Sequence, residues 1–378
     1  MHLYVHVPFC ARRCSYCDFA IAVRKEVPSA RFVDAVLREW EWWRAEGLGK
    51  DLLDTIYLGG GTPSHIDPGE LGRLIAGLVE GNPGSALRET TLEANPDDIT
   101  PERARAWVAA GVDRVSLGSQ SFDPKVLEWM HRTHRAEQVG PAVKMLREAG
   151  IGSISLDLIY ALPPSLERDW ARDLDLAIRL GPEHLSLYGL TVEPHTPLSK
   201  WVASKRSHVA DDEGYAGEFL LAHERLTAAG YGHYEVSNYG RPGHRAIHNS
   251  AYWQRRPFLG LGPSAHSGVA QKRWWNIREY AAWLVAMEGA EPAGVVAALE
   301  DSAYPASVAG WEQLDAERIR IEDLYLGLRT IDGIASSQLP VEIRKGWVDA
   351  GWATDDGTVT QLTPEGWLRL DALVGQVA

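Results

Sequence analysis

The sequence has 378 residues, 45% of them hydrophobic, and a formal net charge of −13 at pH 7, which predicts a large core and argues against a nucleic-acid partner, because binding phosphates needs a basic face. No apolar run approaches the ~20 residues of a membrane span, and the first predicted strand begins too early for a signal peptide. Three clustered cysteines cannot form a disulfide framework, so we expect a cytoplasmic protein, with peripheral contact to a membrane left open.

Strand-like and helix-like segments alternate through the first 230 residues. Ser29 and Thr100 are candidate N-caps of helices over 29–47 and 100–111. This alternation predicts parallel strands, and six units, fewer than the eight of a closed barrel, predict a partial (β/α)6 barrel with functional groups on the loops after the strands. The predicted strands are 3–9, 54–60, 89–95, 114–120, 153–160 and 184–193.

The pattern changes after Gly230, so we divide the chain into three parts: the barrel at 1–230, an aromatic and glycine-rich segment at 231–285 expected to cover the barrel cavity, and a C-terminal module at 286–378. An alanine-rich linker is expected at about 286–310. The module then reads as helix (317–330), helix (339–351), hairpin (352–362) and a last helix from Thr363, an order similar to a winged helix. It carries as much acid as base, which favours a packing or substrate-covering role over DNA binding.

All three cysteines lie in one short run, with the spacing C-x3-C-x2-C at Cys10, Cys14 and Cys17. A 4Fe-4S cluster normally takes four thiolates, so three ligands would leave one iron open to a substrate or cofactor. One alternative is a zinc site completed by His6 or His2. The other is three unrelated buried thiols.

The segment YVHVPFCARRCSYC, residues 4–17, resembles the radical S-adenosylmethionine (SAM) enzymes, in particular the group around oxygen-independent coproporphyrinogen III oxidase. The resemblance implies that the three cysteines bind the cluster, that the methionine moiety of SAM chelates the open iron, and that Tyr4, His6 and Tyr16 line the cluster and the cofactor. The alternative for Tyr4 and His6 is a first strand with alternating faces.

Further SAM-binding candidates follow successive predicted strands, as the barrel rim requires. By the resemblance, backbone groups of a GGTP segment and the Glu93 carboxylate accept the amino end of SAM, and the others contact its carboxylate, ribose and adenine. The alternatives are a tight turn for the glycines, a surface charge for Arg132 and a structural carboxylate for Asp157. The candidates are Gly60, Gly61, Thr62, Glu93, Gln120, Arg132, Asp157 and Gly189.

Two features separate the chain from the oxidases and favour the heme chaperone branch. Phe19 stands where the oxidases carry a further cysteine, and an H-N-x-x-Y-W signature occurs at His248, Asn249, Tyr252 and Trp253. The resemblance implies that this signature binds heme, with His248 as the leading axial ligand, because a neutral imidazole is a common ligand of heme iron. His266 is a second possibility, and packing in the core is the alternative for the two aromatic rings.

The sequence therefore predicts an α/β protein with a partial (β/α)6 radical SAM barrel and a C-terminal α+β extension. By the resemblance it is a heme chaperone that binds a 4Fe-4S cluster, SAM and heme and delivers heme to an acceptor protein, such as a membrane hemoprotein. An electron donor is implied, and SAM cleavage and a homodimer are left open. The rival functions are radical decarboxylation by a coproporphyrinogen III oxidase and a zinc-bound scaffold without redox chemistry.

Overall fold

The computed structural model describes residues 1–48, 52–80, 87–289 and 304–377. Six parallel strands form the centre of one curved sheet, in the order in which they occur along the chain. This arrangement confirms the predicted partial (β/α)6 barrel. The strands are β1 (His2–Val7), β4 (Thr55–Gly60), β5 (Glu89–Ala94), β6 (Arg114–Gln120), β7 (Ser153–Tyr160) and β8 (His184–Gly189).

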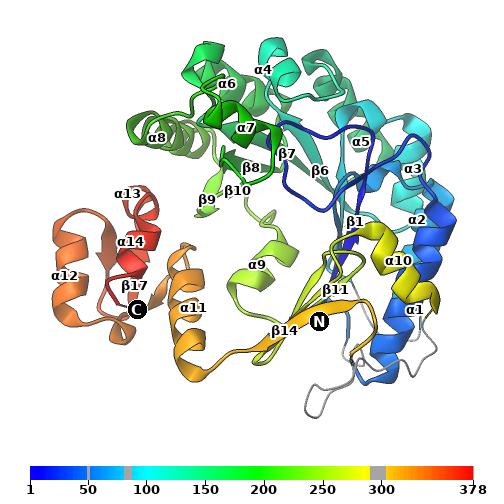
Figure 1. Cartoon of the computed structure of the whole chain (residues 1–378). Helices are drawn as coiled ribbons and strands as arrows, with labels where there is room; N and C mark the ends of the chain where they lie inside the picture. The colour runs from blue at the N-terminus through cyan, green and yellow to red at the C-terminus, as the bar shows by residue number, and fades with distance from the viewer. Residues whose placement is uncertain (49–51, 81–86, 290–303, 378) are drawn as a thin grey trace.

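Helices follow these strands, and most of them cover the convex face of the sheet (Figure 1). Two of them test the predicted N-caps. The Thr100 hydroxyl accepts the Arg103 N–H at 3.2 Å, as expected, whereas the prediction for Ser29 is wrong, because its hydroxyl accepts the N–H of Asp67 at 3.0 Å. The helices are α1 (Ser29–Ala45), α2 (Pro68–Val79), α3 (Pro101–Ala109), α4 (Pro124–Trp129), α5 (Val139–Ala149), α6 (Trp170–Leu180), α7 (Pro197–Ala203) and α8 (Asp212–Ala228).

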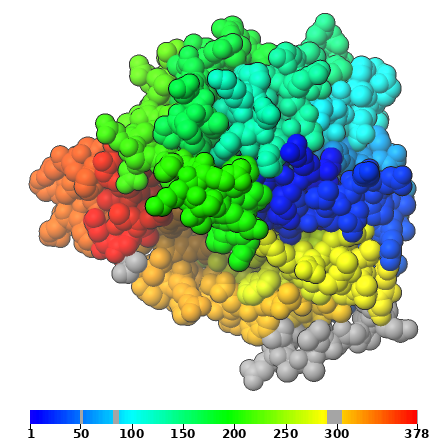
Figure 2. All heavy atoms as spheres, turned by 45° about the horizontal axis from the view of Figure 1, so that its top comes forward, coloured from blue at the N-terminus to red at the C-terminus, as the bar shows by residue number. Residues whose placement is uncertain are grey.

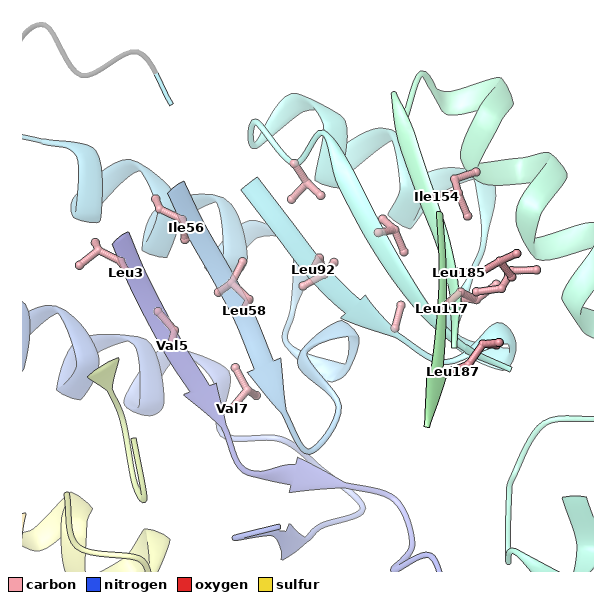
Figure 3. Packing of buried hydrophobic residues seen from close by; sticks show 14 of the residues in the cluster. Leu3, Val5, Val7, Ile56, Leu58, Leu92, Leu117, Ile154, Leu185 and Leu187 are labelled. Carbon is pink, nitrogen blue, oxygen red and sulfur yellow. The ribbon is translucent and has the colours of Figure 1, made fainter. Parts of the chain in front are cut away.

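The two faces of the parallel strands have opposite chemistry. Leu3, Val5 and Val7 of β1 are fully buried and belong to the apolar core under the helices, and Figure 3 shows them beside the equivalent residues of the neighbouring strands. Because side chains alternate along a strand, the residues between them face the other way, into the concave side of the barrel. On β4 and β5 those residues include Tyr57 and Glu93, which line a cavity.

Residues after 230 extend the sheet at both edges. At one edge β9 (Gly232–Glu235) and β10 (Asn238–Gly240) pair antiparallel beside β8. At the other edge β11 pairs parallel with β1 and is followed by three antiparallel strands. These strands are β11 (Phe258–Leu261), β12 (His266–Val269), β13 (Lys272–Asn276) and β14 (Val308–Gln313).

Two expectations for this region therefore need correction. The segment 231–285 builds the sheet edges, and no residue that lines the cavity at the cysteine loop comes from it. In addition, β14 was assigned to the C-terminal module but pairs with β13 of the barrel sheet. The segment also contains α9 (Ile247–Trp253) and most of α10 (Tyr280–Gly289). Residues 290–303 of the expected linker lie outside the described residues.

The C-terminal module has the predicted order of elements and lies beside the barrel in Figure 1. A buried ion pair between Arg329 Nε and Glu235 Oε2, 3.0 Å apart, joins the module to β9. Within the described residues, no helix combines the length and apolar character of a membrane span. The module contains α11 (Ala316–Leu328), β15 (Ile334–Ala335), α12 (Val341–Asp349), β16 (Ala353–Asp355), β17 (Val359–Leu362), α13 (Pro364–Trp367) and α14 (Leu370–Val374).

Candidate cofactor site

The cysteine-bearing loop leaves the barrel and returns to it at one place. It starts at β2 (Phe9–Cys10) and ends at β3 (Ala22–Val23), two short strands that pair parallel. The Ala22 N–H donates to the Pro8 carbonyl at 2.7 Å, and the Arg24 N–H donates to the Cys10 carbonyl at 3.0 Å. The loop therefore has a fixed base, from which Cys14 and Cys17 extend while Cys10 stays buried.

Contacts from three directions hold the middle of the loop. The ring of His6 bonds through Nε2 to the Ala20 carbonyl at 2.9 Å, and its Nδ1 is 3.1 Å from the Tyr4 hydroxyl. The Ser15 N–H donates to the Met130 carbonyl at 3.1 Å, and the Ser15 carbonyl accepts the N–H of Leu198 at 2.8 Å. Figure 2 shows the chain around residue 198, in green, against the blue N-terminal segment. Tyr4 and His6, predicted to line the cluster, thus support the loop from below and lie outside the cavity lining.

A cavity of about 420 Å³ opens between this loop and the ends of the parallel strands. It brings together all three cysteines and most of the predicted SAM-binding residues. From the predicted set, the lining contains Cys10, Cys14, Cys17, Tyr16, Gly60, Gly61, Thr62, Glu93, Gln120, Arg132, Asp157 and Gly189.

The glycines after β4 are required by close packing. A Cβ on Gly60, whose φ is +115°, would lie 2.7 Å from Cε1 of His6, and a Cβ on Gly61 would lie 2.7 Å from the Phe9 carbonyl oxygen. The absence of these side chains lets the GGTP segment reach the cysteine loop. There the Thr62 hydroxyl donates to the Cys10 sulfur at 3.6 Å.

Glu93 brings a partly buried carboxylate to the cavity without an ion-pair partner among the described residues. The Tyr57 hydroxyl donates to one of its oxygens at 2.8 Å, and the Gly60 N–H donates to the other at 2.9 Å. Burial raises its pKa to about 7, against the effect of these two hydrogen bonds. A ligand that carries N–H groups or positive charge would complement this carboxylate.

Arg132 and Gln120 meet at the end of β6. The Arg132 guanidinium donates to the Cys14 sulfur at 3.5 Å and to the Gly118 carbonyl at 2.9 Å, while its Nε is buried without a hydrogen-bond partner. Gln120 adopts a left-handed backbone conformation with φ of 63°. A partly buried cation with an unused donor suits an anionic ligand group such as a carboxylate.

Asp157 and Gly189 complete the opposite wall. The Ser116 hydroxyl donates to the Asp157 carboxylate at 2.9 Å, and burial raises the pKa of that carboxyl to about 6. This leaves a partly buried carboxylate able to accept hydrogen bonds from the hydroxyl groups of a ligand. Gly189 packs against Tyr215, and a Cβ added at Gly189 would collide with the Tyr215 ring unless that exposed side chain moved.

The donor set fits an iron–sulfur cluster better than a single metal ion. In the described parts of the chain, no three histidine, cysteine or acidic side chains gather where one ion could be held, which gives the zinc alternative no support. Three thiols instead surround one cavity. Burial raises the pKa of Cys17 to about 12, so a strongly cationic group is needed to keep such thiols as thiolates. Phe19, 56% exposed, lies on the cavity lining in place of a fourth thiol.

Sequence reasoning missed several lining residues, including Tyr57, Asn95 and Tyr188. Tyr57 and Tyr188 lie within β4 and β8, and only their alternation with buried apolar neighbours marks them as facing inward. Asn95 directly follows β5, and its amide oxygen accepts a hydrogen bond from Arg132 at 2.5 Å. Its position after a strand end was the available signal.

The predicted heme residues lie apart from this cavity, on α9. His248 is fully buried, and its ring nitrogens bond to Thr55 Oγ1 at 2.7 Å and to the Tyr252 hydroxyl at 2.8 Å. The Trp253 ring lies 4.2 Å below the Arg329 guanidinium, and Asn249 is partly exposed. His248 therefore presents no free ring nitrogen in this conformation. His266, the second candidate, is exposed beside Trp275.

One side chain links the two regions. The Tyr57 ring lies 5.1 Å from the His248 ring, centroid to centroid, and its hydroxyl donates to Glu93 in the cavity. The α9 segment and the cysteine-lined cavity therefore share a wall inside the same barrel.

Comparison with known proteins gives matches along the whole chain. The family model described as the radical SAM superfamily matches residues 4–177. A protein named heme chaperone HemW from Mycobacterium tuberculosis (strain ATCC 25618 / H37Rv) is 34% identical over 378 residues, which cover 98% of this chain and 93% of that protein. Heme chaperone HemW from Escherichia coli (strain K12) is 37% identical over 270 residues, 71% of this chain and 70% of that protein.

Among solved structures, coproporphyrinogen III oxidase (HemN) from Escherichia coli, described as a radical SAM enzyme, superposes with a TM-score of 0.78. The match covers 99% of this chain and 89% of the oxidase at 20% identity. At that identity the likeness establishes the fold alone, from the barrel to the C-terminal module.

Proposed function

Because this chain belongs to the radical SAM superfamily, and within it to the family of the proteins named heme chaperone HemW, we propose that it is a heme chaperone. It would bind a 4Fe-4S cluster, SAM and heme in the cytoplasm and deliver heme to an acceptor protein. The observation that carries the proposal is the cavity where three thiols, a partly buried carboxylate and a partly buried guanidinium meet.

In this proposal, different cavity residues bind the cluster and SAM. Cys10, Cys14 and Cys17 hold the cluster on a loop that β2 and β3 fix at its base. Glu93 accepts N–H groups from the amino end of SAM, and Arg132 offers its unpaired Nε to the carboxylate end. When reduced, the cluster can supply an electron to the SAM sulfonium. The electron donor would approach the exposed side of the loop near Phe19.

The H-N-x-x-Y-W segment is the proposed heme site. Its imidazole, phenol and indole groups lie on one short helix, and α9 is packed between the sheet and α11. Because the Tyr252 hydroxyl occupies Nε2 of His248, heme ligation by His248 requires the tyrosine side chain to turn aside. The acceptor protein would take heme from this helix.

The proposal is tested with anaerobically reconstituted protein. We expect roughly four iron and four sulfide per chain, binding of SAM, and stoichiometric uptake of heme with transfer to an apo-hemoprotein. Reconstituted protein that takes up no heme would refute the chaperone function, and protein without iron and sulfide would refute the cluster.

The oxidase-like fold gives the rival enzyme activity a separate assay. Reduced, reconstituted protein is incubated anaerobically with coproporphyrinogen III and SAM. We expect no decarboxylated product, because Phe19 stands where the oxidases carry a cysteine. If the protein decarboxylates coproporphyrinogen III, the chaperone assignment is refuted and the protein is an oxidase.

A further inference from the structure

A chain of hydrogen bonds runs through the base of the barrel to α9. The His2 Nδ1 atom is 2.9 Å from Thr55 Oγ1, which is 2.7 Å from Nδ1 of His248. Nε2 of His248 is in turn 2.8 Å from the Tyr252 hydroxyl. At the far end, His2 Nε2 faces the Asp54 carboxylate at 3.9 Å. Three elements of structure, β1, β4 and α9, thus meet around one buried threonine.

Counting the available protons shows which atom donates and which accepts in each of these hydrogen bonds. A threonine hydroxyl has one proton, so Thr55 can donate to only one of its two histidines and must accept from the other. His2 has an Nε2–H if it points a donor at Asp54, and its Nδ1 then accepts from Thr55. Thr55 consequently accepts from an Nδ1–H of His248, which leaves Nε2 of His248 bare to accept the Tyr252 hydroxyl proton.

The reverse direction fails at both ends. It would place a bare nitrogen of His2 opposite the Asp54 carboxylate, and it would make His248 donate to the Tyr252 oxygen. The Tyr252 hydroxyl would then lose the one acceptor for its proton that the described residues provide, because its only hydrogen bond among them is the one to His248. Unsatisfied buried donors and facing lone pairs are both unfavourable.

We propose that the chain from Asp54 through His2 and Thr55 fixes His248 as the Nδ1–H tautomer, so that Nε2 is the atom offered to heme iron once Tyr252 turns away. Thr55 is therefore a positioning residue for heme binding, an assignment that rests on the proposed heme chaperone function. A hydrogen bond from the second ring nitrogen orients an imidazole and raises its strength as a ligand.

The tautomer is tested first without heme. In protein labelled with ¹⁵N-histidine, the Nε2 of His248 should show the chemical shift of an unprotonated nitrogen and its Nδ1 that of a protonated one. His248→Ala assigns the signals. The opposite pattern, with the proton on Nε2, would overturn the inference whether or not the protein binds heme.

The positioning role is tested with heme in three variants. Thr55→Val keeps the shape of the side chain but removes the hydroxyl, and we expect the Kd for heme to rise about 10–100-fold and the iron–histidine stretching frequency of ferrous heme, seen by resonance Raman spectroscopy, to fall. Thr55→Ser should restore both. Thr91→Val is the matched control, since Thr91 is equally buried but its hydroxyl has no partner.

The outcomes separate the two proposals. An unchanged Kd and stretching frequency in Thr55→Val would overturn the positioning role of Thr55 while heme binding by the wild type stands. Wild-type protein that binds no heme would refute the proposed function and the iron-binding role of Nε2, and the NMR pattern would still decide the tautomer.

Discussion

If Glu93 binds SAM as an ionised carboxylate, the affinity for SAM should depend on pH. We compare wild type with Glu93→Gln, which keeps the size of the side chain but removes its charge. At pH 8 the ionised carboxylate should strengthen SAM binding by about 1.5–3 kcal/mol, the range for a hydrogen bond to a charged group. The Kd of the variant should therefore be roughly 10–150 times that of the wild type.

This advantage should shrink on acidification. The pKa of Glu93 in the protein without SAM is about 7, so the carboxylate is mostly ionised at pH 8 and mostly protonated at pH 6. Deprotonating it for binding costs about 1.4 kcal/mol per pH unit below the pKa. The ratio of the two dissociation constants should consequently fall about tenfold between pH 8 and pH 6.

Isothermal titration calorimetry on reconstituted protein measures both constants. Titration of the SAM amino group affects both proteins alike. Because Asp157 interacts electrostatically with Glu93, the comparison is repeated with Asp157→Asn in both proteins, and there the ratio reports Glu93. A ratio that stays constant between pH 6 and pH 8 would refute the assignment of Glu93 as an ionised acceptor for SAM.

Three further predictions concern the cluster and the fold. Cys14→Ser should abolish the visible charge-transfer absorption of reconstituted protein while the circular dichroism of the barrel stays unchanged; retained absorption would contradict the cluster assignment. Arg329→Ala should lower the free energy of unfolding by about 3–5 kcal/mol in urea, because it leaves the fully buried carboxylate of Glu235 without its cationic partner. Arg320→Ala, at an ion pair on the exposed surface, should change the free energy of unfolding far less. Burial raises the pKa of Glu39 to about 7, so ionisation of this carboxyl destabilises the folded state. The free energy of unfolding of the wild type, relative to that of Glu39→Gln, should therefore rise by about 1.4 kcal/mol per pH unit as the pH falls from 7 toward 4.5. A difference that does not change with pH would refute this prediction.

The parallel core of the fold could be predicted because its signals are local. The run at 54–60 became β4 (Thr55–Gly60), and 114–120 became β6 with the same bounds. Strand alternation and βα rhythm are read from neighbouring residues. The pairing of β11 with β1 joins residues about 250 positions apart. No pattern among neighbouring residues indicates such a long-range pairing. Ser29 failed as a cap for the same reason, since its hydroxyl bonds to distant Asp67.

The sequence predicted the location of the cavity residues better than the surroundings of the heme residues. Cys10 ends β2, Glu93 lies one residue before the end of β5, and Asp157 lies within β7. Topology alone brings the carboxyl ends of such strands to one rim. For His248 the sequence identifies the residue type but gives no information on burial or on the groups at its two ring nitrogens. Thr55 and Tyr57, which determine its surroundings, lie on a strand about 190 residues earlier.

The position of β1 has a consequence for how the protein is made. This strand carries the cysteine loop at its end and is flanked on one side by β4 and on the other by β11. During synthesis on the ribosome, the second flank does not exist until residue 261 has emerged from the exit tunnel. The complete frame of the cysteine loop therefore forms only after most of the chain has been synthesised, and a cluster held by this loop would be loaded late in synthesis or after it.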